Sequence, residues 1–255
     1  MFRQAERAGT RRVYVGIEGS STNDGGFGLA RALGWAFRDA DGVEIKVWTD
    51  LDRLEQGEAP PQQLAFDELI IAVDVDNPLL GKCGASRTYG GQKGLMEADL
   101  PKAEACLRRL AMKIKAVNKK DVSRNKGTGA AGGLGLGLKV FCGGTFQSGG
   151  KILSRLSGLK QRIQKADLVI TAEGALDEQT SRGKVVDIVA QAAARTGKHC
   201  ICLAGSVTAD PADVPWPNFR AYAIVPDIAP SEDESKAHRG KYLAWLATHV
   251  AREIR

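Results

Sequence analysis

A polar, glycine-rich stretch near the start of the chain has the composition of an anion-binding turn. Residues 13–35 read VYVGIEGSSTNDGGFGLARALGW. The first five residues predict a strand, and apolar residues at helical spacing after the turn predict a helix. Glycine lets a backbone approach a ligand closely, and free N–H groups at a helix start favour anions. A plain capped turn is the alternative. We favour a ligand site whose candidate contacts are Gly19, Ser20, Ser21, Thr22, Asn23, Asp24, Gly25 and Gly26.

Two carboxylates, Asp74 and Asp76, come at the end of an apolar run at residues 69–75 that predicts a strand buried on both faces. Residues two apart on a strand share a face, so both carboxylates are expected to point the same way. Mg²⁺ takes oxygen ligands from one or two carboxylates together with phosphates. An Asp-Asn-Pro turn is the alternative, and it accounts for Asp76 but not for Asp74. We therefore interpret both as metal ligands, with Asp74 the stronger candidate.

A lysine follows a pair of glycines in Gly90-Gly91-Gln92-Lys93. An ammonium group on such a loop could neutralise the charge of a transferring phosphoryl group. An ordinary surface lysine is the alternative, and these residues alone favour it. The candidate site residues here are Gln92 and Lys93.

A second glycine-rich segment at residues 127–137 has the spacing G-x-G-x-x-G. The dinucleotide fingerprint needs a strand before it, and Ser-Arg-Asn-Lys precedes this one, so we reject that interpretation. Close helix packing through small residues and a second phosphate cradle remain equally good explanations. The candidate contacts are Gly127, Gly129, Gly132 and Gly133.

Another polar loop follows a predicted strand at residues 168–172. Ligands bind beyond the carboxyl ends of strands in open parallel sheets, so this loop is well placed. Glu173 and Asp177 could hold a metal or accept a hydroxyl proton. A polar loop with helix caps is the alternative. The further candidate contacts are Gln179, Thr180 and Lys184.

The alternation of strands and helices predicts an α/β fold with parallel sheets. A change in composition near residue 166 places a domain boundary there, giving domains 1–165 and 166–255.

Residues 102–126 are basic, but apolar residues at helical spacing run through the first part of this segment, and no aromatic residues interleave with the charges. We therefore expect the basic residues to form the solvated face of a helix, and we expect no nucleic-acid partner. No apolar run is long enough to span a membrane. Five cysteines without metal spacing indicate a reducing cytoplasm, and Cys200 and Cys202 are expected to be core thiols.

Four ordered motifs resemble the type I glycerate kinases. They are GSSTNDGGFG, then VDVDNPLLGKCGAS with YGGQKG, then GTGAAGGLG, and then ITAEGALDEQTSRGK. The resemblance favours a second phosphate cradle over simple helix packing at residues 127–137. It implies phosphorylation of D-glycerate to 2-phosphoglycerate with ATP and Mg²⁺. It also implies catalytic roles for Asp74, Lys93, Glu173 and Asp177. In fold, it implies that 1–165 is an inserted α/β domain and 166–255 is half of a split flavodoxin-like sheet.

This sequence departs from the family's pattern at Glu18 and Ala172, where glycine is usual, and at Ala175, where arginine is usual. It also has no counterpart of the family's N-terminal segment. We therefore keep a second interpretation, a shortened and catalytically impaired homologue that binds a ligand or a partner. We expect a half sheet to leave an edge strand uncovered and the protein to self-associate there.

Overall fold

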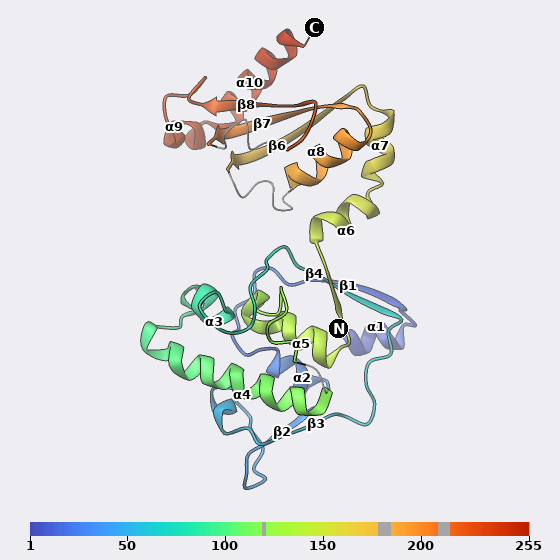
Figure 1. Cartoon of the computed structure of the whole chain (residues 1–255), viewed down its shortest axis with the longest axis vertical. Helices are drawn as coiled ribbons and strands as arrows, with labels where there is room; N and C mark the ends of the chain where they lie inside the picture. The colour runs from blue at the N-terminus through green and yellow to red at the C-terminus, as the bar shows by residue number, and fades with distance from the viewer. Residues whose placement is uncertain (119–120, 178–184, 209–214, 255) are drawn as a thin grey trace. The chain divides into compact units, whose positions relative to one another are not determined.

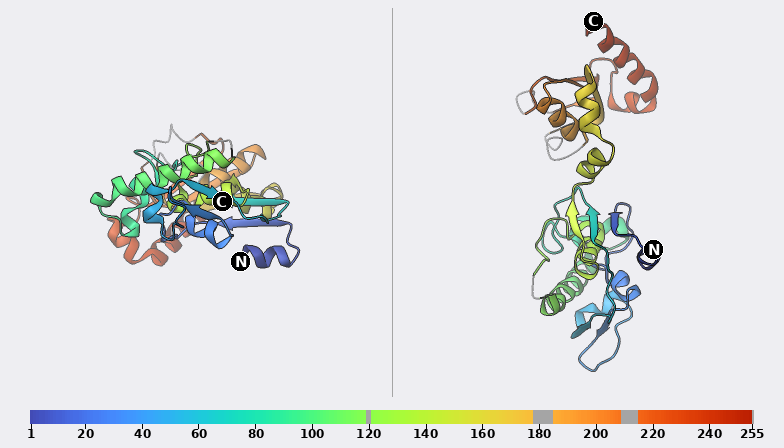
Figure 2. Two further views of the ribbon diagram at one scale, coloured as in Figure 1. Left: turned by 90° about the horizontal axis from the view of Figure 1, so that it is seen from below. Right: turned by 90° about the vertical axis from the view of Figure 1, so that its right-hand side faces the viewer.

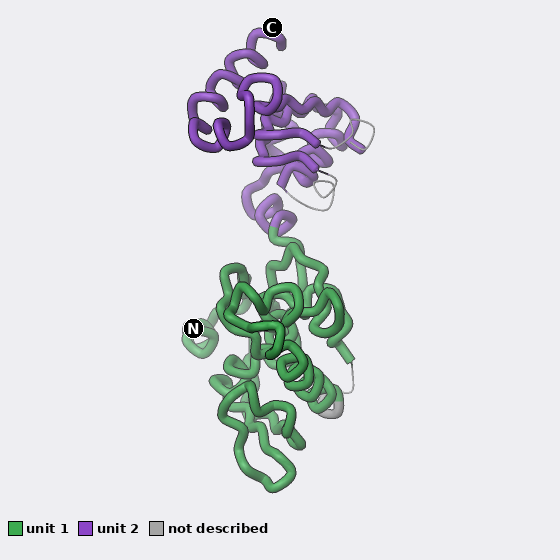
Figure 3. Tube along the Cα trace, turned by 90° about the vertical axis from the view of Figure 1, so that its left-hand side faces the viewer, with its two compact units in different colours: residues 1–149 green, residues 150–255 purple. Residues whose placement is uncertain are grey.

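The computed structural model describes residues 1–118, 121–177, 185–208 and 215–254. They form two compact units, Met1–Gly149 and Gly150–Arg255 (Figure 3). The boundary falls earlier than the predicted residue 165, because the helices α6 (Gly149–Leu156) and α7 (Leu159–Lys165) lead into the second unit. Ile163 of α7 packs in one cluster with Val169 and Ala190 of that unit.

The first unit is built on three parallel strands, β1 (Arg12–Gly16), β4 (Glu68–Ala72) and β5 (Thr145–Gln147), in the order β1-β4-β5. Leu69, Ile70 and Ile71 in the central strand are buried, which confirms the parallel α/β fold class. The helix α1 (Phe2–Arg7) lies beside β1 (Figures 1 and 2).

Helices cover this sheet and enclose an aromatic and leucine core that includes Phe27, Phe37, Leu107 and Leu136. The α-helices are α2 (Phe27–Ala32), α3 (Ala85–Tyr89), α4 (Leu100–Asn118) and α5 (Leu134–Phe141). The 3-10 helices are η1 (Trp48–Arg53), η2 (Gly91–Lys93), η3 (Glu97–Asp99) and η4 (Ala130–Gly133). The short strands β2 (Ala36–Arg38) and β3 (Gln56–Glu58) pair antiparallel.

The basic helix α4 has the solvated face that its pattern predicts. Leu107, Leu110 and Ile114 are buried. Arg109 and Lys113 each form an ion pair with Glu55. Part of the positive charge on this helix is thus neutralised within the chain, and the absence of a nucleic-acid partner stays a prediction.

The second unit has three longer parallel strands, β6 (Leu168–Leu176), β7 (His199–Val207) and β8 (Phe219–Val225), in that order. Figure 1 shows α7 and α8 (Val185–Arg195) on one face, and α9 (Glu232–Ala237) and α10 (Arg239–Glu253) on the other. Cys200 and Cys202 are buried, as predicted, and burial raises their thiol pKa values to about 11 and about 12. No helix in the described ranges has the length and apolar character of a membrane span.

One face of the edge strand β6 is open. Ile170 is 61% exposed, although residues of parallel strands are usually buried on both faces. An exposed apolar side chain on this strand agrees with an incompletely covered sheet face, whereas an uncovered sheet edge and self-association through it stay predictions.

Candidate functional site

The carboxyl ends of the three strands in the first unit bring candidate residues to one edge of the sheet. Residues 17–26 follow β1, Asp74 follows β4, and Ser148 follows β5. Because the strands are parallel, these segments leave the sheet on the same side, where open α/β sheets bind ligands. The first glycine turn and the first carboxylate thus lie at the edge expected for a site.

The backbone of residues 19–22 offers unsatisfied donors. None of these four N–H groups has a hydrogen-bond acceptor among the described residues, and the segment is exposed or half-buried. The ammonium group of Lys93 lies against it, donating to the backbone oxygen of Ser20 and, at 2.7 Å, to its hydroxyl. A row of free N–H groups beside an ammonium group has the chemistry suited to binding an anion.

A small hollow of about 140 Å³ opens beside this turn. Burial lowers the pKa of Lys93, and it raises the pKa of Tyr89 together with the nearby charge of Glu18. The structure therefore brings together the predicted residues of the first turn and of the Gln92-Lys93 loop, and it places Glu18 in their wall. The lining residues are Ile17, Glu18, Gly19, Ser20, Val75, Tyr89, Gln92, Lys93, Ala130 and Ala131.

Tyr89 is a wall residue that we did not predict. Its hydroxyl donates to Asn77 Oδ1 at 2.6 Å, and Asn77 Nδ2 donates to the backbone oxygen of Cys83 at 2.8 Å. These bonds hold the segment after β4 against the helix that carries Lys93's loop. The sequence held one indication of this role, because Tyr89 directly precedes the two glycines of that loop.

The predicted contact Asn23 lies inside the fold. It is 4% exposed, and its Nδ2 donates to Ser86 Oγ at 2.9 Å. Asp24 also has an internal role, because its two carboxylate oxygens accept from the N–H groups of Gly26 and Gly28, each at 2.9 Å. These two side chains hold the turn in place.

The glycines of the two glycine-rich segments pack against each other. A Cβ on Gly26 would lie 2.6 Å from the Cα of Gly137, and a Cβ on Gly132 would lie 1.9 Å from the backbone oxygen of Thr22. Gly25 donates its N–H to the backbone oxygen of Gly132 at 3.1 Å. Close packing, one of the two explanations of residues 127–137, is therefore confirmed as a role of these glycines.

Further along the second segment, backbone donors are also used within the fold. Gly129 donates to the backbone oxygen of Asn77, and Gly133 donates to that of Gly129. Gly127 has a φ of +83° and packs beside Val73. A phosphate contact from Gly127, Gly129, Gly132 or Gly133 stays a prediction.

The two predicted metal ligands are placed differently from each other. Asp74 Oδ1 accepts from Ser148 Oγ and from the N–H of Gly149, both at 2.9 Å, whereas Oδ2 has no partner in the described part of the chain. Asp76 pairs with Lys126 at 2.6 Å.

The expected strand across residues 69–75 was too long. Ladder pairing of β4 with β5 ends at Ala72 and Gln147, so neither aspartate lies in the strand and they do not share a strand face. Across the described ranges, no three His, Cys, Asp or Glu residues gather as a metal site. One free oxygen on Asp74 fits Mg²⁺ held largely by phosphate and water.

The carboxylates of the second unit lie at the end of β6. Glu173 was expected after the strand, but β6 continues to Leu176 because its pairing with β7 extends to Val207. Glu173 Oε1 accepts from the N–H of Gly174 at 3.0 Å. Asp177 directly follows the strand. The predicted contacts Gln179, Thr180 and Lys184 fall outside the described residues.

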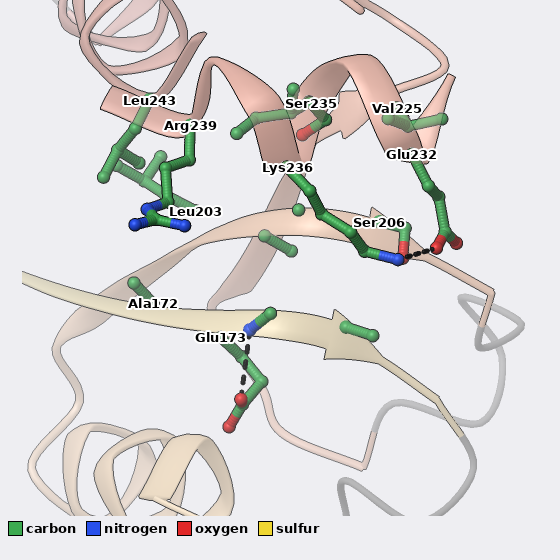
Figure 4. Close-up of a pocket in the computed structure, with 15 residues that line it drawn as sticks. Ala172, Glu173, Leu203, Ser206, Val225, Glu232, Ser235, Lys236, Arg239 and Leu243 are labelled. Atoms are coloured by element: carbon green, nitrogen blue, oxygen red, sulfur yellow. Dashed lines mark hydrogen bonds and ion pairs between the residues drawn. The ribbon is translucent and has the colours of Figure 1, made fainter. Parts of the chain in front are cut away.

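A hollow of about 740 Å³ adjoins this strand end. Lys236 in its wall pairs with Glu232 at 2.8 Å, and Arg239 extends toward Leu203 and Leu243 (Figure 4). The carboxylate of Glu173 points away from both cations (Figure 4). The open face of β6 and this hollow form one partly apolar surface.

Free N–H groups, a lysine and a carboxylate lie at the carboxyl edge of a parallel sheet, so the chain is an α/β protein with a candidate site for an anion. The sequence model of the glycerate kinase family matches residues 1–255, and the chain belongs to that family. It is 39% identical over 211 residues to the glycerate 2-kinase of Escherichia coli (strain K12), covering 81% of this chain and 55% of that protein. It is 37% identical over 248 residues to the glycerate kinase of Halalkalibacterium halodurans, covering 95% and 65%.

A solved structure from the same family also matches this chain. The crystal structure of a candidate glycerate kinase 2 from Salmonella typhimurium LT2 matches with a TM-score of 0.70 and 34% identity, covering 99% of this chain and 68% of that one. The chain thus spans 55% and 65% of the two curated relatives named above.

Proposed function

We propose that this chain takes part in the transfer of a phosphoryl group from ATP to D-glycerate, giving 2-phosphoglycerate. The observation that carries the proposal is the row of free N–H groups at residues 19–22 beside the ammonium group of Lys93. Phosphoryl transfer depends chiefly on positioning and on neutralising negative charge, and it needs no reactive side-chain nucleophile. Membership of the glycerate kinase family supports the choice of reaction.

The backbone donors and Lys93 would bind phosphate oxygens of the nucleotide. Lys93 already contacts Ser20, so little reorganisation is needed to present its charge to a ligand at the turn. Gln92 in the same wall could add an amide donor.

Asp74 is the residue that we propose for Mg²⁺, through its unpartnered Oδ2. Asp74 would hold the Mg²⁺, whose positive charge would neutralise the negative charge of the nucleotide's phosphates. The bonds that Oδ1 accepts from Ser148 and Gly149 fix the carboxylate's orientation. Asp76 is the weaker candidate because it is paired with Lys126.

The acceptor hydroxyl must lose its proton as its oxygen bonds to the γ-phosphorus and the bond to the ADP oxygen breaks. Glu173 and Asp177 are the carboxylates we propose for that proton. Asp177 directly follows the strand end, and Glu173 Oε1 accepts a hydrogen bond from the N–H of Gly174.

Glu18 favours a second candidate function. Glu18 is one of the residues that line the hollow that we assign to phosphate, and its negative charge acts on Tyr89 in the same wall, where it would repel a nucleotide. A homologue that binds ligand weakly and does not turn it over would have this feature. We keep this non-catalytic binding function as the alternative.

A coupled assay of the full chain with ATP, Mg²⁺ and D-glycerate tests the proposal, with the product identified by ³¹P NMR. We expect 2-phosphoglycerate to form, and Lys93→Met to reduce its rate of formation by about 100-fold or more. Nucleotide binding by calorimetry without turnover supports the non-catalytic alternative. If the folded protein neither binds nucleotide nor forms product, both proposed functions are contradicted.

A further inference from the structure

Tyr89 lines the hollow beside the first turn, and the proton of its hydroxyl group is already used within the fold. The hydroxyl donates to Asn77 Oδ1 at 2.6 Å. The other side of the amide fixes the direction of this bond, because Asn77 Nδ2 lies 2.8 Å from the backbone oxygen of Cys83, which can only accept. The amide nitrogen must therefore face Cys83, so that Oδ1 faces Tyr89 and the tyrosine is the donor.

Asn77 is held from a second side, which keeps that proton in place. Its backbone oxygen accepts from the N–H of Gly129 at 2.9 Å. The two segments are in close contact there, since a Cβ on Gly129 would lie 2.1 Å from the backbone oxygen of Pro78. Tyr89 itself is half-buried, and burial raises the pKa of its hydroxyl, so the phenol is neutral at ordinary pH.

The oxygen of the Tyr89 hydroxyl is left as an acceptor. Within the described part of the chain, no group donates a hydrogen bond to it. The charge of Glu18 acts on this hydroxyl, so the oxygen lies within electrostatic range of another residue that lines the hollow. A phenol whose proton is in use and an ionised carboxylate can both accept but cannot donate. This part of the wall therefore suits a ligand O–H group and disfavours phosphate or carboxylate oxygens.

The rest of the wall has the opposite chemistry. Lys93 and the free N–H groups of residues 19–22 favour oxyanions. The hollow, at about 140 Å³, is smaller than most small-molecule sites. Donors for an oxyanion and an acceptor for a hydroxyl group in so small a space match a compact acid that carries a hydroxyl group close to its charge. The ribose and base of a nucleotide do not fit this description.

We propose that Tyr89 recognises the acceptor substrate, its oxygen accepting a hydrogen bond from the substrate hydroxyl group that is not phosphorylated. In glycerate phosphorylated at its 2-position, that group is the 3-hydroxyl. Tyr89 is then a specificity-determining residue, which distinguishes an acid with two hydroxyl groups from an acid with one. The inference rests on the proposed function for its choice of ligand.

Calorimetry of the full chain with D-glycerate and with D-lactate, which lacks the 3-hydroxyl group, tests the inference in the presence of Mg²⁺ and a non-hydrolysable ATP analogue. We expect D-glycerate to bind at least about fivefold more tightly, because D-lactate leaves an acceptor in the hollow unpaired. Tyr89→Phe should reduce this preference to within about twofold, chiefly by weakening the binding of D-glycerate. The matched control is Tyr242→Phe, which removes a hydroxyl that donates to Glu234 Oε1 at 3.1 Å outside the hollow, and it should leave the preference unchanged.

An equal loss for both acids in Tyr89→Phe would mean that the tyrosine acts only by holding Asn77, and would overturn the inference. Equal binding of the two acids by the unsubstituted chain, or no binding of either, would also overturn it. So would a lower affinity for ATP in Tyr89→Phe with an unchanged preference between the acids, which would assign the contact to the nucleotide. These outcomes concern binding and not turnover, so they are separate from the coupled assay, in which a lack of product counts against the proposed reaction alone. Circular dichroism checks that both variants are folded.

Discussion

Two motif glycines of the first unit and one of the second differ in what surrounds them. In the first unit, Gly26 and Gly132 leave no room for a Cβ atom because backbone from another segment lies there. In the second unit, a Cβ on Gly174, beside the candidate carboxylates, would meet nothing within 4 Å. The comparison shows that motif residues of one protein can be required for packing in one place and be open to a ligand in another.

The same distinction divides the first motif itself. Residues 19–22 have free N–H groups, whereas Asn23 to Gly26 are held by bonds and contacts within the fold. We infer that the buried half positions the exposed half. Four predictions test this division, beginning with the largest expected effect.

Gly132→Ala should lower the free energy of unfolding by about 4 kcal/mol or more, because its Cβ would lie 1.9 Å from a backbone oxygen at a φ of +65°. The matched control is Gly174→Ala, which we expect to change stability by less than about 1 kcal/mol. Denaturant unfolding monitored by fluorescence and circular dichroism measures both. Similar stabilities for the two variants would remove the basis of the comparison.

Lys93→Met should leave stability nearly unchanged and reduce the rate of phosphoryl transfer by about 100-fold or more, as loss of a preorganised charge does. Lys82→Met serves as the control, since Lys82 is an exposed lysine of the same unit outside the hollow. Steady-state kinetics with ATP and glycerate provide the measurement. An equal effect of the two substitutions would show that Lys93 is an ordinary surface lysine.

Asp74→Asn should weaken the binding of Mg·ATP by about tenfold and leave metal-free nucleotide binding nearly unchanged, because an amide oxygen is a poorer ligand for Mg²⁺ than a carboxylate. Asp76→Asn is the control with the same chemistry, and we expect a smaller effect from it. Calorimetry with and without Mg²⁺ separates the two contributions. An equal loss under both conditions would exclude Asp74 as the metal ligand.

Glu18→Gly should tighten ATP binding by about tenfold at low salt, which corresponds to about 1.4 kcal/mol. The gain should shrink as the salt concentration rises, since exposed charges are screened. Calorimetry across a salt series tests this. The same affinity in both proteins at low salt would mean that the carboxylate does not act on the ligand, and the departure from the family pattern would then carry no functional meaning.

The fold class followed from the sequence because predicted strands and helices alternate along the chain. Strand ends did not follow, since they depend on a partner. β4 ends where β5 ends, and β6 continues past Glu173 because β7 pairs with it. The role of the glycines could not be read from composition either. A phosphate cradle and close backbone packing both require the absence of a Cβ, so only the contacts of Gly132 and Gly137 separate them.

Hydrogen exchange of the full chain, with and without saturating ATP and Mg²⁺, tests most directly the claim that the exposed half of the first motif binds phosphate while the buried half and residues 127–137 support it. We predict slower exchange at the amides of residues 19–22 on adding nucleotide. The amides of Gly25, Gly129 and Gly133, already bonded within the fold, should exchange slowly in both states. Protection that appears at these three glycines and not at residues 19–22 would contradict the claim.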